Sequence, residues 1–473
     1  MPRNFQLAPN ACFADPPPRP TPRRQGSALR CAGCHGYHAA KLLNATQGGV
    51  RYANVWEETA VPCPVTPPLE GVHQARVLVV GAGYLGLSAA LHLALAGEDV
   101  IVVDAEAPGW GASGRNGGQV IPGLKYDPSE LEALFGRERG ERIWRFAGAS
   151  ADFVFDLVAR HRLACNARRA PWIQGIHSHK AALRARRRVD DWTKRGAPVS
   201  FLDRGQVAAL TGTDIYIGAF ADHRAGALQP LSYVRELARV ALGAGARVHA
   251  GARVVALDAE RSGWRAVTAN GATVRANTVL MATNAYADDL VPGIARSIVA
   301  LNSLQIATAP IPPPLRRMLL PNGETLSDTR RVIRYWRLDD EGRLLMGGRG
   351  PYGEAESAHD WDHLARDVRK HFPALRDIPF THRWGGRVAM HVDYLPRLHQ
   401  PQPGLLVAIG CQGRGIGWQT AMGAELARLA TDAHYDPVLP FSPVRPIPFH
   451  PLKALAVAST IAAYRAFDRL GFS

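Results

Sequence analysis

Three glycines and one acid, placed around short apolar runs, carry the first chemical signal of this 473-residue chain. Gly81, Gly83 and Gly86 have the GxGxxG spacing and directly follow an apolar run. Glycine at these positions permits a tight turn, a close approach of the backbone to a pyrophosphate, and close packing of a helix on a strand. Asp104 ends the next apolar run, where an acid accepts hydrogen bonds from an adenosine ribose. The stretch 77–105 therefore predicts a strand, turn, helix and strand that bind a dinucleotide.

Two further glycine-rich segments contain polar residues suited to the same cofactor. The segment 109–119, GWGASGRNGGQ, can direct backbone amides at a pyrophosphate and at a cofactor ring. The segment 410–417, GCQGRGIG, precedes a predicted helix, whose N-terminal dipole would stabilise negative charge. The cofactor contacts predicted from these segments are Ser113, Arg115, Asn116, Gly117, Gly118 and Gln119 in the first, and Gly413, Gly415 and Gly417 in the second.

The elements that must position these residues alternate between helical and extended patterns, which indicates an α/β or α+β fold. No internal repeat is visible. Predicted helices cover residues 141–164, 180–195, 231–242 and 418–432, and predicted strands cover residues 278–282, 298–308, 332–349 and 405–409.

The net charge of the chain bears on which classes of partner it could bind. The chain has a net charge of +15 and a pI of about 9.9, and such a balance can attract nucleic acid or anionic lipid. However, Asp190 and Asp191 interrupt the densest basic cluster, and no nucleic-acid motif accompanies it. We therefore interpret the cluster as a solvated helix face and expect no nucleic-acid partner. It consists of Arg184, Arg186, Arg187, Arg188, Lys194 and Arg195.

The location of the chain is predicted from what its sequence lacks. No apolar run reaches the ~18 residues that span a bilayer, so we expect no membrane span. The N-terminus shows no hydrophobic signal core, which favours a cytoplasmic protein. The six cysteines are too scattered for a disulfide scaffold.

The N-terminal residues contain one isolated motif. Residues 1–50 are predicted to form a disordered or loosely ordered extension, because the first thirty are rich in Pro and Arg and show no periodicity. Within it, Cys31, Cys34 and His35 have the CxxCH spacing of c-type haem attachment, and with His38 they would also suit zinc. We interpret the spacing as chance and predict no metal site.

Eight separated motifs support a family resemblance. They are GAGYLG (81–86), GWGASGRNGGQ (109–119), GALQP (226–230), VLMATNAYADDLVP (279–292), SDTRRVIRYWR (327–337), LLMGGRG (344–350), RWGGRVAMHVDYLPRL (383–398) and GCQGRGIG (410–417). Together they resemble the FAD-dependent D-amino-acid oxidase superfamily, in its gamma-glutamylputrescine oxidase-like branch, which is related to glycine and sarcosine oxidases. The resemblance covers roughly residues 50 to 470.

The resemblance implies FAD as the cofactor and an α/β fold. We expect a Rossmann-type FAD-binding domain with an inserted α+β substrate domain, built on a second, mainly antiparallel sheet. The expected divisions are 72–150, 223–297 and 383–440 for the discontinuous FAD-binding domain, 151–222 and 298–382 for the substrate domain, and 441–473 for a C-terminal helical tail.

The implied reaction is oxidation of a C–N bond in a small amine or amino-acid-like substrate. A hydride leaves the carbon that bears the amine for flavin N5, and the resulting imine hydrolyses. Tyr335, Arg337 and Arg349 lie on strands that the family directs at the flavin, and they are the candidate substrate-binding residues. The alternatives are an amine dehydrogenase with an acceptor other than oxygen and a non-catalytic flavin-binding protein. The sequence leaves the amine and the oligomeric state open.

Two departures from sarcosine oxidases refine these expectations. The cysteine that links their flavin aligns with Gly386, so FAD is expected to bind without a covalent bond. The lysine that holds their substrate carboxylate aligns with Gly417, which favours an amine whose carboxylate is remote or missing, such as a primary or acylated polyamine. No lysine occurs between Lys194 and Lys370, which predicts a slow reaction with oxygen unless Lys125 reaches the site.

Overall fold

The computed structural model describes residues 46–47, 50–51, 53–351, 355, 357–450, 457–461, 463–464 and 467. All of them belong to one compact unit. The predicted extension 1–50 lies almost entirely outside the described residues, and so does the CxxCH motif.

The first sheet has a parallel centre in the order β11–β4–β3–β14. Its long strand β14 pairs with β3 along one edge. Along the other edge, β14 pairs first with the antiparallel β13 and then with the parallel β21. The strands of this sheet are β3 (Val72–Val80), β4 (Val100–Val103), β11 (Arg247–His249), β12 (Val254–Glu260), β13 (Gly263–Thr268), β14 (Thr273–Met281), β20 (Arg397–Gln402) and β21 (Leu405–Ile409).

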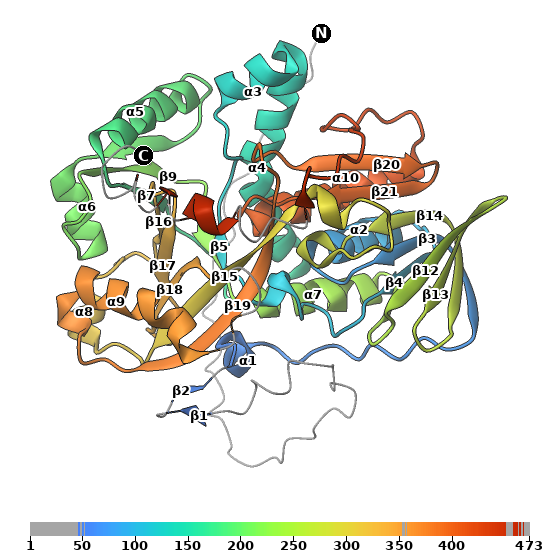
Figure 1. The fold of residues 1–473 in the computed structure, drawn as a ribbon, viewed down its shortest axis with the longest axis horizontal. Helices are drawn as coiled ribbons and strands as arrows, with labels where there is room; N and C mark the ends of the chain where they lie inside the picture. The colour runs from blue at the N-terminus through green and yellow to red at the C-terminus, as the bar shows by residue number, and fades with distance from the viewer. Residues whose placement is uncertain are drawn as a thin grey trace, which may run out of the picture. The chain divides into compact units, whose positions relative to one another are not determined.

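Four helices form one hydrophobic core with this sheet: α2 (Tyr84–Leu95), α4 (Arg137–His161), α7 (Pro230–Gly243) and α10 (Gly415–Thr431). Figure 1 shows α2 and α7 beside β3 and β4. The buried residues Val77–Val80 explain why β3 lies inside the sheet, since apolar side chains point to both of its faces. The opposite face packs on β12, β13 and the segment 285–298.

The second sheet has ten strands, in the order β1–β2–β19–β15–β18–β17–β16–β7–β9–β8. All of its pairings are antiparallel except β16 with β7 and β19 with β2. Its strands are β1 (Thr46–Gln47), β2 (Val50–Arg51), β7 (Trp172–Ile176), β8 (Val199–Leu202), β9 (Gly218–Asp222), β15 (Val299–Thr308), β16 (Thr325–Asp328), β17 (Arg334–Leu338), β18 (Leu344–Arg349) and β19 (Phe380–Met390).

Smaller elements complete the unit. A three-stranded sheet joins β5, β10 and β6, so that the end of the first glycine segment pairs with the segment before α7. Apart from short 3-10 helices, the other elements are α1 (Trp56–Thr59), α3 (Pro128–Phe135), α5 (His179–Thr193), α6 (Arg204–Thr211), α8 (Pro313–Arg316), α9 (Asp362–His371), β5 (Gln119–Val120), β6 (Arg168–Arg169) and β10 (Gly226–Ala227).

The predicted fold class is confirmed, as are the four predicted helices, which correspond to α4, α5, α7 and α10. Two details differ. The predicted strand 332–349 is a hairpin of β17 and β18, because the chain reverses at Asp339–Gly342, where Gly342 has a φ of +76°. The boundary predicted at residue 383 falls inside β19, which pairs with β15 and so belongs to the second sheet.

Candidate active site

Packing requires glycine at each position of the first turn. Gly81 has a φ of +115°, and a Cβ atom there would lie 2.9 Å from the backbone of Ala282. A Cβ at Gly83 would approach Ser113 Oγ to 2.9 Å, and one at Gly86 would overlap the carbonyl oxygen of Gly81. Gly83 provides no side-chain cap for helix α2, and the amide of Tyr84 donates to Ser113 Oγ at 3.1 Å. The N-terminus of α2 therefore suits a pyrophosphate, which would accept hydrogen bonds from the remaining amides of its first turn.

Asp104 follows β4 and lies beside this turn. Its carboxylate accepts hydrogen bonds from the amides of Ala82, at 2.6 Å, and Glu106, at 2.9 Å. Burial raises the pKa of Asp104 to about 6, although these two bonds oppose the shift. Asp104 thus connects the glycine turn to the end of β4. From this position a carboxylate would accept hydrogen bonds from the ribose of a bound dinucleotide.

Side chains from distant elements hold the loop that follows. Four consecutive carbonyl oxygens, those of Gly114, Arg115, Asn116 and Gly117, each accept at least one side-chain hydrogen bond. The donors are Asn54 Nδ2 to Gly114 at 2.7 Å, Gln305 Nε2 and Trp384 Nε1 to Arg115 at 2.6 and 3.0 Å, Trp56 Nε1 to Asn116 at 2.8 Å, and Arg337 Nε to Gly117 at 2.7 Å. The loop conformation is therefore fixed by protein contacts.

Asn116 braces the loop from within. Its Nδ2 donates to the Tyr84 hydroxyl at 2.9 Å and to two loop carbonyls, and its Oδ1 accepts from the amide of Gly118 at 2.8 Å. Arg115 places its guanidinium over the Trp110 ring, 4.4 Å from the centroid. Gln119 donates to the carbonyls of Leu326 and Trp336, both at 3.2 Å. These three predicted cofactor residues thus also organise the loop.

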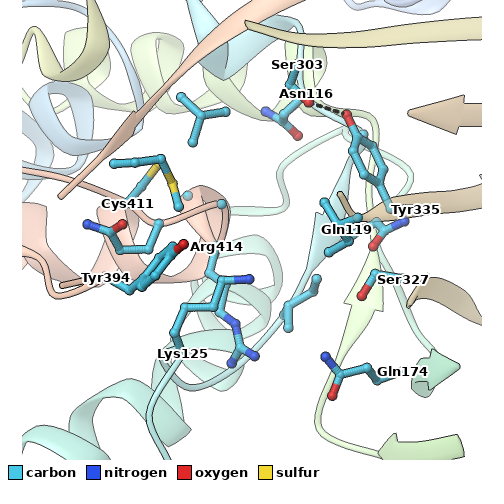
Figure 2. A pocket seen from close by; sticks show the side chains of 18 of the residues that line it. Asn116, Gln119, Lys125, Gln174, Ser303, Ser327, Tyr335, Tyr394, Cys411 and Arg414 are labelled. Atoms are coloured by element: carbon cyan, nitrogen blue, oxygen red, sulfur yellow. Dashed lines mark hydrogen bonds between the residues drawn. The ribbon is translucent and has the colours of Figure 1, made fainter. Parts of the chain in front are cut away.

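A cavity of about 890 Å³ lies between the two glycine loops and the second sheet. Figure 2 shows side chains from both loops and from β7, β15, β16 and β17 around it. Of the predicted site residues, its lining includes Ser113, Arg115, Asn116, Gly117, Gln119, Gly413, Gly415, Tyr335 and Arg349.

The second glycine loop contributes an uncapped helix start to this cavity. Gly410 and Gly413 have positive φ values of +89° and +82°, and α10 begins at Gly415 without a side-chain cap. Two buried atoms of lining residues, Gln412 Oε1 and Gln419 Nε2, have no hydrogen-bond partner among the described residues. The lining therefore offers glycines, a helix dipole and unsatisfied polar atoms to a polar, flat ligand.

The three predicted substrate residues occupy different places. Tyr335 lines the cavity, its hydroxyl is 2.8 Å from Ser303 Oγ (Figure 2), and burial raises its pKa to about 12. Arg349 also lines the cavity, and burial lowers its pKa. Arg337 is absent from the lining, because its guanidinium donates to the carbonyls of Gly117 and Leu228. That placement favours a positioning role for Arg337.

Gly81, Gly83, Gly86 and Asp104 lie outside the lining of this cavity, and so do Gly118 and Gly417, which serve packing. A Cβ at Gly417 would lie 2.9 Å from Ser150 Oγ, so this glycine lets α10 approach α4. A Cβ at Gly118 would lie 2.3 Å from the carbonyl oxygen of Leu228, and its φ is +67°. A spacing pattern alone does not distinguish these positions from those that face a ligand.

Sequence reasoning missed several cations of the cavity, among them Arg414 and the cluster residues Arg184, Arg187 and Arg188, and left Lys125 undecided. Arg414, at the start of α10, lines the cavity with only 9% of its surface exposed. Lys125, which follows the first glycine segment, also lines it. Lys125 is exposed to solvent, and desolvation by the surrounding cavity walls, with the charges of Arg414 and Arg188, lowers its pKa. The placement of Arg414 inside a glycine motif was the available signal.

The described residues bear on two expectations, that of no metal site and that of no membrane span. Within the described ranges, no group of three or more His, Cys, Asp and Glu side chains is arranged to hold a metal ion. In the same ranges, every helix is too short or too polar to cross a membrane. The basic cluster on α5 is partly neutralised, since Arg188 pairs with Asp127 and Arg195 pairs with Asp191.

Comparison with known proteins places this geometry among flavoproteins. The family model described as "FAD dependent oxidoreductase" (DAO) matches residues 76–429. The chain is 33% identical over 381 residues to a probable oxidoreductase, OrdL, of Rhizobium meliloti, covering 79% of this chain and 87% of that protein. It is 29% identical over 404 residues to gamma-glutamylputrescine oxidoreductase of Escherichia coli, covering 84% and 93%. The fold is similar to that of glycine oxidase from Geobacillus kaustophilus, with a TM-score of 0.67 at 22% identity, over 79% of this chain and 100% of that chain.

Proposed function

The chain belongs to the family of FAD-dependent oxidoreductases, and from this premise we propose that it oxidises the C–N bond of a small amine or amino-acid-like molecule. The observation that carries the proposal is the cavity, because both glycine loops and the polar side chains of the second sheet meet there. Relatives named for this chemistry include the gamma-glutamylputrescine oxidoreductase.

The residues present fit FAD. Gly81, Gly83 and Gly86 would admit the pyrophosphate, Asp104 would accept from the ribose hydroxyls, and the loops 112–117 and 410–415 would hold the ring. Bound FAD supplies an acceptor for a hydride from the carbon that carries the nitrogen. The unsatisfied atoms of two cavity glutamines support a ligand with complementary donors and acceptors.

The protein's own contribution is to bind the amine and exclude water. Tyr335 and Ser303 form a hydrogen-bonded pair at one side of the cavity, where they can orient the amine. An amine is oxidised in its neutral form, and the cations that line the cavity lower the pKa of a bound amine. Arg337 acts as a positioning residue, since it holds Gly117 and Leu228.

The absence of a covalent bond between the protein and the flavin is part of the proposal. Gly386 lines the cavity where the linking cysteine of sarcosine oxidases aligns, and glycine offers no sulfur. Cys411 also lines the cavity, but burial raises the pKa of its thiol, which disfavours the nucleophilic thiolate. We therefore propose that FAD is held by non-covalent contacts alone.

Lys125 changes the expectation about oxygen. A slow reaction with oxygen was predicted because no lysine occurs between Lys194 and Lys370, unless Lys125 reached the site, and Lys125 lines the cavity. A lysine in this cavity favours an oxidase over a dehydrogenase. Mixing the reduced protein with oxygen in a stopped-flow instrument tests whether it is an oxidase. Reoxidation with stoichiometric hydrogen peroxide is expected. Reoxidation by another acceptor but not by oxygen would favour a dehydrogenase.

The central experiment is anaerobic titration of the purified yellow protein with a panel of amines. Bleaching of the flavin absorption bands by at least one primary or secondary amine is expected. A stable flavin spectrum that no amine bleaches would contradict the proposal and favour a non-catalytic flavin-binding protein.

A further inference from the structure

The C-terminal tail supplies one side chain to the wall of the cavity. The family model matches the chain only as far as residue 429, whereas Tyr464 lines the cavity. Residues 457–461 and 463–464 are helical, and the Tyr464 side chain is half-buried. A residue outside the matched range therefore faces the same space as the two glycine loops.

Three other lining residues converge on Tyr464 from separate parts of the fold. They are Arg331 in the loop between β16 and β17, Arg349 at the end of β18, and Tyr394, which follows β19. The Arg331 guanidinium lies 5.0 Å from the centroid of the Tyr464 ring and 5.6 Å from that of the Phe467 ring. Residues three apart on a helix share a face, so one cation contacts two aromatic rings of the tail.

Tyr394 contacts the hydroxyl of Tyr464. Burial, and then a hydrogen bond between the two hydroxyls, raises the pKa of Tyr394. Burial lowers the pKa of Arg349, and both tyrosines lie close enough to oppose that shift. Tyr394 has a φ of +57°, which bulky residues rarely adopt, and 40% of its surface is exposed, so it lies where the cavity meets solvent. Figure 2 shows it across the cavity from Tyr335.

An aromatic wall at this boundary can select substrates by size. The cavity of about 890 Å³ is larger than a small amine requires, so its interior alone selects little by size. The Tyr464 ring is held on its face by Arg331 and at its hydroxyl by Tyr394. A side chain fixed at two points does not move aside for a larger ligand without losing those contacts.

We propose that Tyr464 is a specificity-determining residue, which admits amines with a slender chain and excludes those with a bulky substituent on the nitrogen. This inference rests on the proposed function and deepens it, because it describes the shape of the substrate. Arg331 is a positioning residue, since it acts through the Tyr464 ring. The wall formed by these two residues and Tyr394 is called the tail wall below.

The first test measures access to the flavin without turnover. Iodide quenches flavin fluorescence on contact, and the bimolecular quenching constant of the FAD-loaded protein reports how open the cavity is. Tyr464→Ala should raise this constant about twofold or more, because the ring held by Arg331 is removed. Tyr464→Phe, which keeps the ring, should raise it less. Arg331→Lys keeps the charge but loses the planar group that stacks on the ring, so it should also raise the constant. Phe449→Ala, at an exposed ring of the same tail, should change nothing.

The second test uses the reaction. Each amine of the panel is compared with its N-benzyl derivative, and Tyr464→Ala should raise kcat/KM for the derivatives about tenfold or more relative to their parents. The double variant Arg331→Lys/Tyr464→Ala should match Tyr464→Ala, and a further change would overturn the positioning role of Arg331.

Two results would overturn the tail wall: an unchanged quenching constant in Tyr464→Ala, or an equal change in kcat/KM for parents and derivatives. If the quenching constant rose while no amine bleached the flavin in any variant, the proposed function would fail and the tail wall would stand.

Discussion

Asp104 performs two tasks at the end of β4, and its ionisation links them. As a carboxylate it accepts from the amides of Ala82 and Glu106 and can also accept from a ribose. Burial raises its pKa to about 6. Hydroxyl donors favour the ionised form, so cofactor binding opposes protonation.

FAD affinity should therefore depend on pH. Below the pKa of about 6, Asp104 is protonated and loses acceptor capacity, so the FAD dissociation constant should rise as the pH falls through that value. Asp104→Asn should weaken FAD binding about tenfold and abolish this pH dependence, since one charge-assisted bond is worth ~1.5–3 kcal/mol. Fluorescence titration of the apoprotein measures both effects. Asp99→Asn, at an exposed acid before β4, is the matched control, and an unaltered pH profile in Asp104→Asn would contradict the assignment.

The proposed non-covalent cofactor can be tested at two residues. Acid precipitation should release the yellow colour into the supernatant, because Gly386 has no sulfur and burial keeps Cys411 as a thiol. Colour retained in the pellet of the wild-type protein, but released from Cys411→Ser, would show that Cys411 forms a bond to the flavin.

At the scale of elements, a segment before the first sheet fastens the glycine loop. Asn54 and Trp56 donate to the carbonyls of Gly114 and Asn116, and Trp56 packs edge-on against Trp384 with ring centroids 6.3 Å apart. The segment 53–61 therefore acts as a clamp on the loop from outside the cavity.

Two truncations separate this clamp from the residues before it. Deleting residues 1–45 should leave FAD content and folding intact. Deleting residues 1–62 should reduce FAD affinity by at least tenfold, because two hydrogen bonds to the loop and the buried Trp56 are lost. The absorbance ratio of flavin to protein, measured after gel filtration, gives the comparison. Trp56→Phe, which keeps the ring but loses the hydrogen bond, should give an intermediate loss, and full FAD content in the longer truncation would rule the clamp out.

The predictable part of the site is local in sequence. Gly81, Gly83, Gly86 and Asp104 fall within one strand–helix–strand unit, so their spacing was sufficient to locate them. The role of Arg337 was not predictable, because its acceptors are 109 and 220 residues away in the chain.

The position of a residue on a strand also does not show which of two neighbouring candidate site residues faces the cavity. Tyr335 and Arg337 are two residues apart on β17 and so share a face, yet only Tyr335 reaches the cavity. Arg414 was not predicted for another reason. A glycine-rich motif indicates contacts made by the backbone, whereas here the arginine side chain between the glycines lines the cavity. Side-chain function of this kind follows from tertiary packing.

At the scale of the whole molecule, the two glycine loops, which follow strands of the first sheet, face the second sheet across the cavity, and a ligand that contacts both loops connects them. Saturation with FAD should stabilise the folded protein by about 2.7 kcal/mol at one hundred times the dissociation constant. Denaturant unfolding of the apoprotein with and without FAD measures this gain. At the same concentration, riboflavin, which lacks the pyrophosphate and adenosine, should stabilise much less. Equal stabilisation by both ligands would show that the glycine turn beside α2 contributes nothing to binding.

The packing of α10 on α2 also sets the order in which the chain can mature during synthesis. Ser88 on α2 donates to the carbonyl of Thr420 on α10, a bond between residues 332 positions apart. At ribosomal speeds, α2 waits on the order of tens of seconds for that partner. During this interval the side of α2 that carries Ser88 and Ala89, which packs against Gly423, has no cover from α10. Nascent chains that stall before residue 415 should therefore be clients of chaperones and proteases, however complete their first nucleotide-binding motif is.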